Sequence, residues 1–191
     1  KTLDREGQDV AAIIMEPVMF NTNCIFPRPG YLEEVRRLCD EHGVVLVFDE
    51  VITGFRLAPG GAQELLGVTP DLATFAKAAA GGFPLSILAG KQEIMALIAD
   101  GTVHHGGTLN SNMMCMAAAE ATLEKLVEND GAVHKQLYAT GNRLMEGLRQ
   151  LANRHEQPMI VHGPGPAFDM SFTDAEEDEI IDYRSHIRNV D

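Results

Sequence analysis

The sequence has 191 residues, of which 45% are apolar, so it is long enough for one large domain or parts of two and is neither disordered nor fibrous. Its 15 Lys and Arg against 28 Asp and Glu give a net charge of -13, and the basic residues form no run, which argues against nucleic acid or anionic lipid as a partner. Every apolar run is shorter than the roughly 18 to 20 residues of a membrane helix, which argues against a membrane partner.

Short apolar runs alternate with helical patterns from the start of the chain. Residues 11–15 (AAIIM) predict a first strand. The next pattern predicts a helix that begins near Pro29 and ends at Gly43. Residues 44–48 (VVLVF) then predict a second strand, which is followed directly by Asp49 and Glu50.

The same alternation continues beyond a loop that contains Pro59, Gly60 and Gly61. Residues 71–76 predict a third strand, residues 85–90 a fourth, and residues 91–100 a short helix. Strands without polar interruption, separated by helices, are typical of an α/β domain. We therefore expect a mainly parallel sheet covered on both faces.

The pattern of predicted elements changes in the last third of the chain. Helices are predicted over residues 112–127 and 132–155, and two short strands around a Gly-Pro turn over residues 158–173. We place a boundary near residue 129. Residues 1–129 then form part of a large α/β domain, and residues 130–191 form part of a smaller α+β domain.

The three cysteines are scattered and form neither a disulfide framework nor the spacing of a zinc site. A reducing compartment, the cytoplasm, is the expected location. The chain begins at Lys1 without an initiator Met, so we expect a piece of a longer protein.

Two strand ends carry groups suited to chemistry. Ligands of open parallel sheets bind at the carboxyl ends of the strands, where Asp49 and Lys77 both lie. Small residues follow Lys77 and leave room beside its amine. Separately, the two could be a solvated carboxylate and a surface lysine. Together, they fit pyridoxal phosphate, which needs an amine for its aldehyde and an acid for its ring nitrogen.

Three segments carry a family resemblance: EPVMFNTNCIFPRPGYLEEVRRLCDEHGVVLVFDEVITGFR, GGAQELLGVTPDLATFAKAAAGGFPL and HHGGTLNSN. In order and spacing they resemble the class III pyridoxal-phosphate aminotransferases, and within that class glutamate-1-semialdehyde 2,1-aminomutase and related amino-acid transaminases. The resemblance implies a fold-type I, aspartate-aminotransferase-like transferase with a large cofactor-binding domain. It also implies that this chain is less than half of a family member and lacks the N-terminal phosphate-binding turn.

The resemblance assigns a role to each matching residue. Lys77 would bond the cofactor aldehyde and then act as the base that moves a proton, and Asp49 would keep the pyridine nitrogen protonated. Val51 would press on the ring from beneath. Asn21 would reach the ring hydroxyl, and Glu16 ends the first strand as Asp49 ends the second.

The resemblance also implies a homodimer, because the threonine that matches Thr108 binds the phosphate of the partner subunit's cofactor. The alternative for Thr108 is a simple helix cap. His104 and His105 are not expected to bind metal, because adjacent side chains diverge and no third ligand has suitable spacing.

Three functions follow, in this order. The first is a transaminase that moves an amino group between an amino compound and a keto acid or aldehyde. The second is the intramolecular amino transfer of the aminomutase, which uses the same residues. The third is a nucleotide-binding module or nicotinamide-dependent dehydrogenase, which would need a GxGxxG turn that no glycine cluster here provides. Ser86 and residues 110–113 depart from the family pattern, which leaves open a β- or ω-amino substrate.

Overall fold

The chain folds as two compact units. The computed structural model describes residues 2–190. The first unit comprises the chain up to Pro17 together with Arg28–Lys125, and the second comprises Val18–Pro27 together with the chain from Leu126 onward. The division into domains 1–129 and 130–191 stays a prediction, and the segment 18–27 belongs with the later part of the chain.

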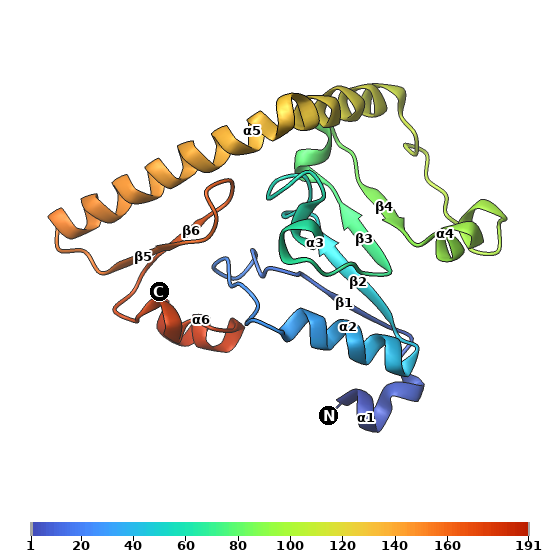
Figure 1. Cartoon of the computed structure of the whole chain (residues 1–191), viewed down its shortest axis with the longest axis horizontal. Coiled ribbons are helices and arrows are strands. Elements are labelled where there is room, and N and C mark those ends of the chain that lie inside the picture. The colour runs from blue at the N-terminus through green and yellow to red at the C-terminus, as the bar shows by residue number, and fades with distance from the viewer. Residues whose placement is uncertain (1, 191) are drawn as a thin grey trace. The chain divides into compact units, whose positions relative to one another are not determined.

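A four-stranded sheet forms the frame of the first unit (Figure 1). Its strands lie in chain order: β1 (Ala12–Met15), β2 (Val45–Glu50), β3 (Leu72–Phe75) and β4 (Ile87–Gly90). The first three are parallel, and β4 is antiparallel to β3. The predicted mainly parallel sheet is therefore confirmed, and its parallel pairs are joined through helices α2 (Tyr31–His42) and α3 (Gly61–Leu66).

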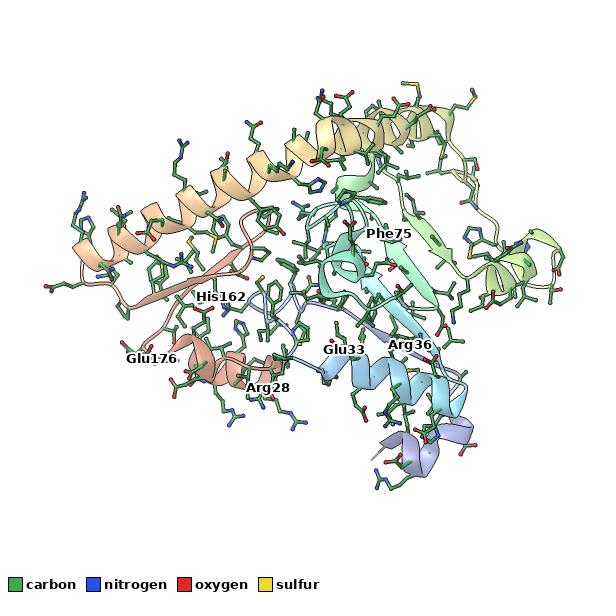
Figure 2. The ribbon with its side chains drawn as sticks, in the orientation of Figure 1. Arg28, Glu33, Arg36, Phe75, His162 and Glu176 are labelled. Atoms are coloured by element: carbon green, nitrogen blue, oxygen red, sulfur yellow. The ribbon has the colours of Figure 1, made fainter. Side chains whose placement is uncertain are left out.

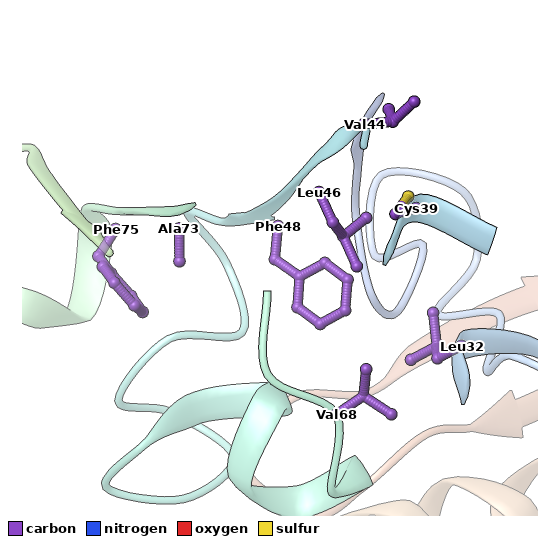
Figure 3. Close-up of a cluster of buried hydrophobic side chains, with 8 residues drawn as sticks. All are labelled: Leu32, Cys39, Val44, Leu46, Phe48, Val68, Ala73 and Phe75. Atoms are coloured by element: carbon purple, nitrogen blue, oxygen red, sulfur yellow. The ribbon is translucent and has the colours of Figure 1, made fainter. Parts of the chain in front are cut away.

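Helix α2 supplies the apolar cover of one face of this sheet. It ends where predicted, because Gly43 adopts the left-handed conformation (φ 67°) and returns its N–H to the carbonyl of Cys39. The cluster on this face joins α2 to alternate strand residues (Figure 3). Its buried members are Leu32, Cys39, Val44, Leu46, Phe48, Val68, Ala73 and Phe75.

The two faces of the sheet differ in burial. Along β2, Leu46, Phe48 and Glu50 are buried, whereas the residues between them are half-buried. On β1, Ile14 is 66% exposed. We expected both faces of the sheet to be covered, but within the described residues only one face is covered. Asp49 lies on the other, half-buried face.

Asp71, just before β3, ties the helices to the sheet. Its Oδ2 accepts hydrogen bonds from Arg36 Nη1 (2.8 Å) and from the backbone amide of Leu46 (2.7 Å), and its Oδ1 lies 2.6 Å from Lys91 Nζ. Arg36 extends from α2 (Figure 2), and its Nη1 donates the hydrogen bond to Asp71. Burial by itself would raise the pKa of Asp71, but the hydrogen bonds from Lys91, Leu46 and Arg36 together lower it.

The remaining elements of the first unit are short. They are α1 (Thr2–Glu6), the 3-10 helices η1 (Gly7–Asp9) and η2 (Lys77–Ala80), and α4 (Gln92–Ala99). Helix α3 falls where a loop is predicted. Its six residues follow two glycines, and a helix so short has too few apolar positions to show a helical period.

Helix α5 (Met113–Arg154) is interrupted near its middle. Residues 128–131 have non-helical dihedral angles, with positive φ at Asn129, Asp130 and Gly131. The two helical parts on either side agree with the predicted helices over residues 112–127 and 132–155.

The second unit adds a hairpin and two short helices to the later part of α5. Strands β5 (Met159–His162) and β6 (Asp169–Phe172) pair antiparallel and are followed by η3 (Glu177–Glu179) and α6 (Tyr183–Asn189). A small core of Ile25, Ile160 and Ile180 holds segment 18–27 to this unit. None of the helices within residues 2–190 is long and apolar enough to cross a membrane.

Candidate active site

The parallel strands place three candidate residues at one edge of the sheet. Asp49 is the penultimate residue of β2, and it pairs in register with Thr74 of β3. Lys77 is the second residue after β3, and Glu16 is the first after β1. The carboxyl ends of these strands are where open sheets bind their ligands, so the predicted edge exists as described.

Asp49 is held through only one of its carboxylate oxygens. Its Oδ1 accepts hydrogen bonds from the backbone amide of Val51 (3.0 Å) and from Thr74 Oγ1 (3.5 Å). Its Oδ2 has no hydrogen-bond partner among residues 2–190. The carboxylate is therefore oriented by the protein and keeps one free oxygen on the half-buried face of the sheet.

Lys77 opens the 3-10 helix η2 with an unusual backbone. Its φ is 35°, a left-handed value that a lysine adopts at a cost in free energy. Ala79 and Ala80 are buried and anchor the turn. The side chain of Lys77 is exposed and makes no hydrogen bond or ion pair within the described residues. Its surroundings are thus more open than the small residues after it suggested.

Val51 contributes to the site through its backbone amide, and it lies just outside strand β2. Strand β2 ends at Glu50, and Val51 begins the turn that follows. The alternation that would place its side chain on the same face as Asp49 therefore stops one residue short. Val51 is half-buried, and its N–H fixes the Asp49 carboxylate.

The sequence suggests that Glu50 orients neighbouring loops rather than performs chemistry, but it does not reveal which residues Glu50 contacts. It is completely buried and accepts hydrogen bonds from Thr53, Ala62 and Gln63. The available signal was its position at the end of a buried run. Two of the three partners, Ala62 and Gln63, are 12 and 13 positions away and lie in a segment that was predicted as a loop.

Thr108 lies in an exposed turn before α5. The cap of that helix is Asn112, whose Oδ1 accepts from the amides of Met114 (3.1 Å) and Cys115 (3.3 Å). The alternative that Thr108 is a helix cap is therefore not what the structure shows. Thr108 has no hydrogen-bond partner in the described residues.

The last two candidates differ in their surroundings. Glu16 is half-buried and lies one position beyond the register pair Met15 and Phe48, level with Asp49. Asn21 is exposed and belongs to the second unit, so the structure does not relate it to Asp49.

Within residues 2–190, no group of three or more His, Cys, Asp or Glu side chains could hold a metal ion.

Comparison with known families places the chain. A model of the family described as "Aminotransferase class-III" matches residues 1–187. The chain belongs to this family. Membership in the class III aminotransferases agrees with the three sequence segments that resemble them, and it sets aside the nicotinamide-dependent alternative.

Solved structures of two aminotransferases resemble the chain over most of its length. An omega-transaminase from Sphaerobacter thermophilus is 30% identical with a TM-score of 0.87, and the match covers 96% of this chain and 41% of that one. A β-phenylalanine aminotransferase from Variovorax paradoxus is 32% identical, with a TM-score of 0.76 over 89% of this chain and 39% of that one.

An aminomutase is also among the similar structures. The glutamate-1-semialdehyde aminomutase from Pseudomonas aeruginosa PAO1 is 27% identical, with a TM-score of 0.74 over 86% of this chain and 38% of that one. The chain thus spans about two fifths of the length of the solved structures that it matches.

Proposed function

We propose that the protein is a pyridoxal-phosphate-dependent transaminase, which moves an amino group between an amino compound and a keto acid or aldehyde. The observation that carries the proposal is the placement of Asp49 and Lys77 at the carboxyl ends of adjacent parallel strands, each with an unengaged polar group. Membership in the class III aminotransferases supports it.

The functional groups of Lys77 and Asp49 at this edge fit the cofactor. Pyridoxal phosphate, when bound, supplies an aldehyde carbon that reacts with amines and a pyridinium ring that accepts electrons. It needs one amine and one carboxylate from the protein. Lys77 and Asp49 supply both, and neither the amine nor Asp49 Oδ2 is engaged by another described residue.

Lys77 performs two tasks in this proposal. Its ε-amine would hold the cofactor at the edge of the sheet by condensing with the aldehyde, with loss of water. When the amine is free of the cofactor, the same nitrogen would act as the base that moves a proton between the substrate carbon and the cofactor carbon. The exposed position of the side chain leaves it free to move between these tasks.

Asp49 acts through charge. The Val51 amide and the Thr74 hydroxyl hold its Oδ1 in place. Its Oδ2 would accept a hydrogen bond from the protonated ring nitrogen. A carboxylate fixed in this way keeps the proton on the ring nitrogen and stabilises negative charge that spreads from the substrate carbon.

The other predicted site residues complete the proposal. Val51 bounds the ring, Asn21 reaches the ring hydroxyl, and Glu16 bounds the edge beside Asp49. Thr108 binds the cofactor phosphate of a partner subunit, which makes the protein a homodimer. Its exposed, unengaged hydroxyl is compatible with such a contact. We place the enzyme in the cytoplasm, where its free cysteines would stay reduced.

A β- or ω-amino compound is the proposed donor class. The names of two similar structures, an omega-transaminase and a β-phenylalanine aminotransferase, support it. Intramolecular transfer is the second candidate, which the similar aminomutase supports. The two reactions differ in whether a separate carbonyl compound receives the amino group.

Amino transfer from a panel of α-, β- and ω-amino donors to pyruvate tests the proposal. The purified full-length protein with added pyridoxal phosphate should form alanine, and Lys77→Ala should lose this activity. Lys135→Ala, at an exposed lysine that pairs with Asp130, should retain it. Equal activity in Lys77→Ala would refute the proposal. Isomerisation of an amino aldehyde, with its amino group moved to another carbon of the same skeleton and no alanine formed from pyruvate, would favour the aminomutase reaction.

A further inference from the structure

Glu50 is a buried acid directly after the proposed catalytic Asp49. Its side chain is 0% exposed, and strand alternation directs it to the face opposite Asp49. Among residues 2–190, no lysine, arginine or histidine pairs with it. A buried carboxylate without a cation costs free energy unless hydrogen bonds satisfy its oxygens.

Four donors meet this carboxylate. Oε2 accepts from Thr53 Oγ1 (2.9 Å) and from the backbone amide of Ala62 (2.5 Å). Oε1 accepts from the backbone amide of Gln63 (3.2 Å) and from Gln63 Nε2 (3.0 Å). Both carboxylate oxygens act as acceptors in these contacts, and an amide would replace one of the two acceptors with an NH2 group.

The first residue of α3 is shaped around Glu50. Gly61 has φ 74°, and a Cβ at this position would collide with Glu50 Oε2. The helix therefore approaches the carboxylate more closely than any residue with a side chain would allow. Glu50 thus fixes both the turn through Thr53 and the start of α3 to the end of β2.

The turn that Glu50 holds is the turn that orients Asp49. It begins at Val51, whose N–H donates to Asp49 Oδ1, and it includes Gly54, whose N–H donates to the carbonyl of Glu50 (2.9 Å). If Glu50 released Thr53, the turn could shift, and the Val51 amide would shift with it. The free Oδ2 of Asp49 would then lose its fixed direction.

We infer that Glu50 is a positioning residue for Asp49: its buried, hydrogen-bonded carboxylate clamps residues 51–63 in place and thereby fixes the direction of the Asp49 carboxylate. The inference rests on the proposed function, because it gives Glu50 a task only if Asp49 holds the ring nitrogen. It goes beyond that function by assigning a role to a residue that does not touch the cofactor.

Removal of single donors tests the clamp without removal of the buried carboxylate. Thr53→Val replaces a hydroxyl by a methyl group of similar size, and Gln63→Ala removes the side-chain donor but keeps the backbone one. Each should lower kcat about tenfold with KM changed less than about twofold, because a small misplacement of a catalytic group affects mainly the transition state. Glu50→Gln should lower kcat more strongly than either of these variants. Glu33→Gln, at an exposed position of α2, should leave kcat and KM unchanged.

The deciding measurement is a double-mutant cycle with Asp49→Asn, read as the rate of the first half-reaction followed by the absorbance of bound pyridoxal phosphate. With Asp49 already changed, Thr53→Val and Gln63→Ala should each cost less than about a further twofold. The pH profile of the cofactor absorbance should shift in the same direction in Thr53→Val, Gln63→Ala and Asp49→Asn.

Each other outcome overturns a specific claim. If the rate losses of the single variants multiply in the double variants with Asp49→Asn, Glu50 only stabilises the fold and the inference fails. The same conclusion follows if the pH profile of the cofactor absorbance in Thr53→Val and Gln63→Ala equals that of the parent. If Asp49→Asn itself changes neither rate nor absorbance, the proposed role of Asp49 fails, and the clamp fails with it. Unchanged kcat in Thr53→Val and Gln63→Ala with an impaired Asp49→Asn refutes the clamp alone.

Discussion

The backbone amide of Val51 donates a hydrogen bond to Asp49 Oδ1 across 3.0 Å. The residue after the strand thus holds one oxygen of the carboxylate and leaves the other free. An amide side chain at position 49 could keep this contact through its own oxygen, but it could not bear the charge that a protonated ring nitrogen requires.

Asp49→Asn should therefore separate cofactor binding from catalysis. We expect the variant to bind pyridoxal phosphate and to transfer amino groups about 10² to 10³ times more slowly, because it loses electrostatic stabilisation of the transition state. Cofactor titration and kcat measure the two effects. Asp174→Asn, at an exposed site of the second unit, is the control. A normal rate in Asp49→Asn would refute the ring-nitrogen role.

Asp71 should contribute to stability in a pH-dependent way. Its pKa in the folded protein lies below the ordinary value of 3.8, so its contribution is fully present above about that pH and is lost as pH falls through the folded pKa. Asp71→Asn should lower the free energy of unfolding by about 3 kcal/mol at neutral pH, because it leaves Arg36 without its buried partner.

The pH series of denaturant unfolding checks this claim. The difference between the parent and Asp71→Asn should shrink as the pH falls below about 4. Asp40→Asn removes the exposed partner of the same Arg36 and should cost less than about 1 kcal/mol. A difference that is independent of pH, or equal effects of the two variants, would contradict the central role of Asp71.

Two glycines of α5 should respond oppositely to the same substitution. A Cβ at Gly141 would collide with the carbonyl oxygen of Gly165, in the turn between β5 and β6, whereas a Cβ at Gly147 would meet nothing within 4 Å. Gly141→Ala should therefore destabilise the protein by about 2 kcal/mol or more. Gly147→Ala should stabilise it by up to about 1 kcal/mol through helix propensity.

Thermal or denaturant unfolding of both glycine variants measures this difference. The comparison holds the chemical change constant and varies only the space around the added methyl group. Equal effects of the two substitutions would mean that the hairpin turn does not pack directly on the helix backbone.

The sequence predicted the sheet well because its signals are local. Unbroken apolar runs marked β1, β2 and β3, and the helix breaker Gly43 marked the end of α2. The interruption of α5 at residues 128–131 likewise lies where the sequence pattern predicted the boundary between two helices. In each case a few neighbouring residues decide the local conformation.

The features that escaped prediction depend on distant residues. Helix α3 begins beside Glu50, whose carboxylate accepts the amides of Ala62 and Gln63, and no pattern within six residues reveals such a contact. The left-handed backbone of Lys77 is equally invisible, because a lysine does not favour it. Local patterns therefore located Asp49 and Lys77 but could not show what holds them.

The most direct test of the account is the site of covalent attachment of the cofactor. The purified full-length protein is mixed with pyridoxal phosphate, reduced with borohydride, digested and analysed by mass spectrometry. The account predicts a yellow protein whose reduced cofactor is attached to Lys77, with no such product in Lys77→Ala. A colourless protein that pyridoxal phosphate leaves unchanged, or a cofactor attached to another lysine, would contradict it.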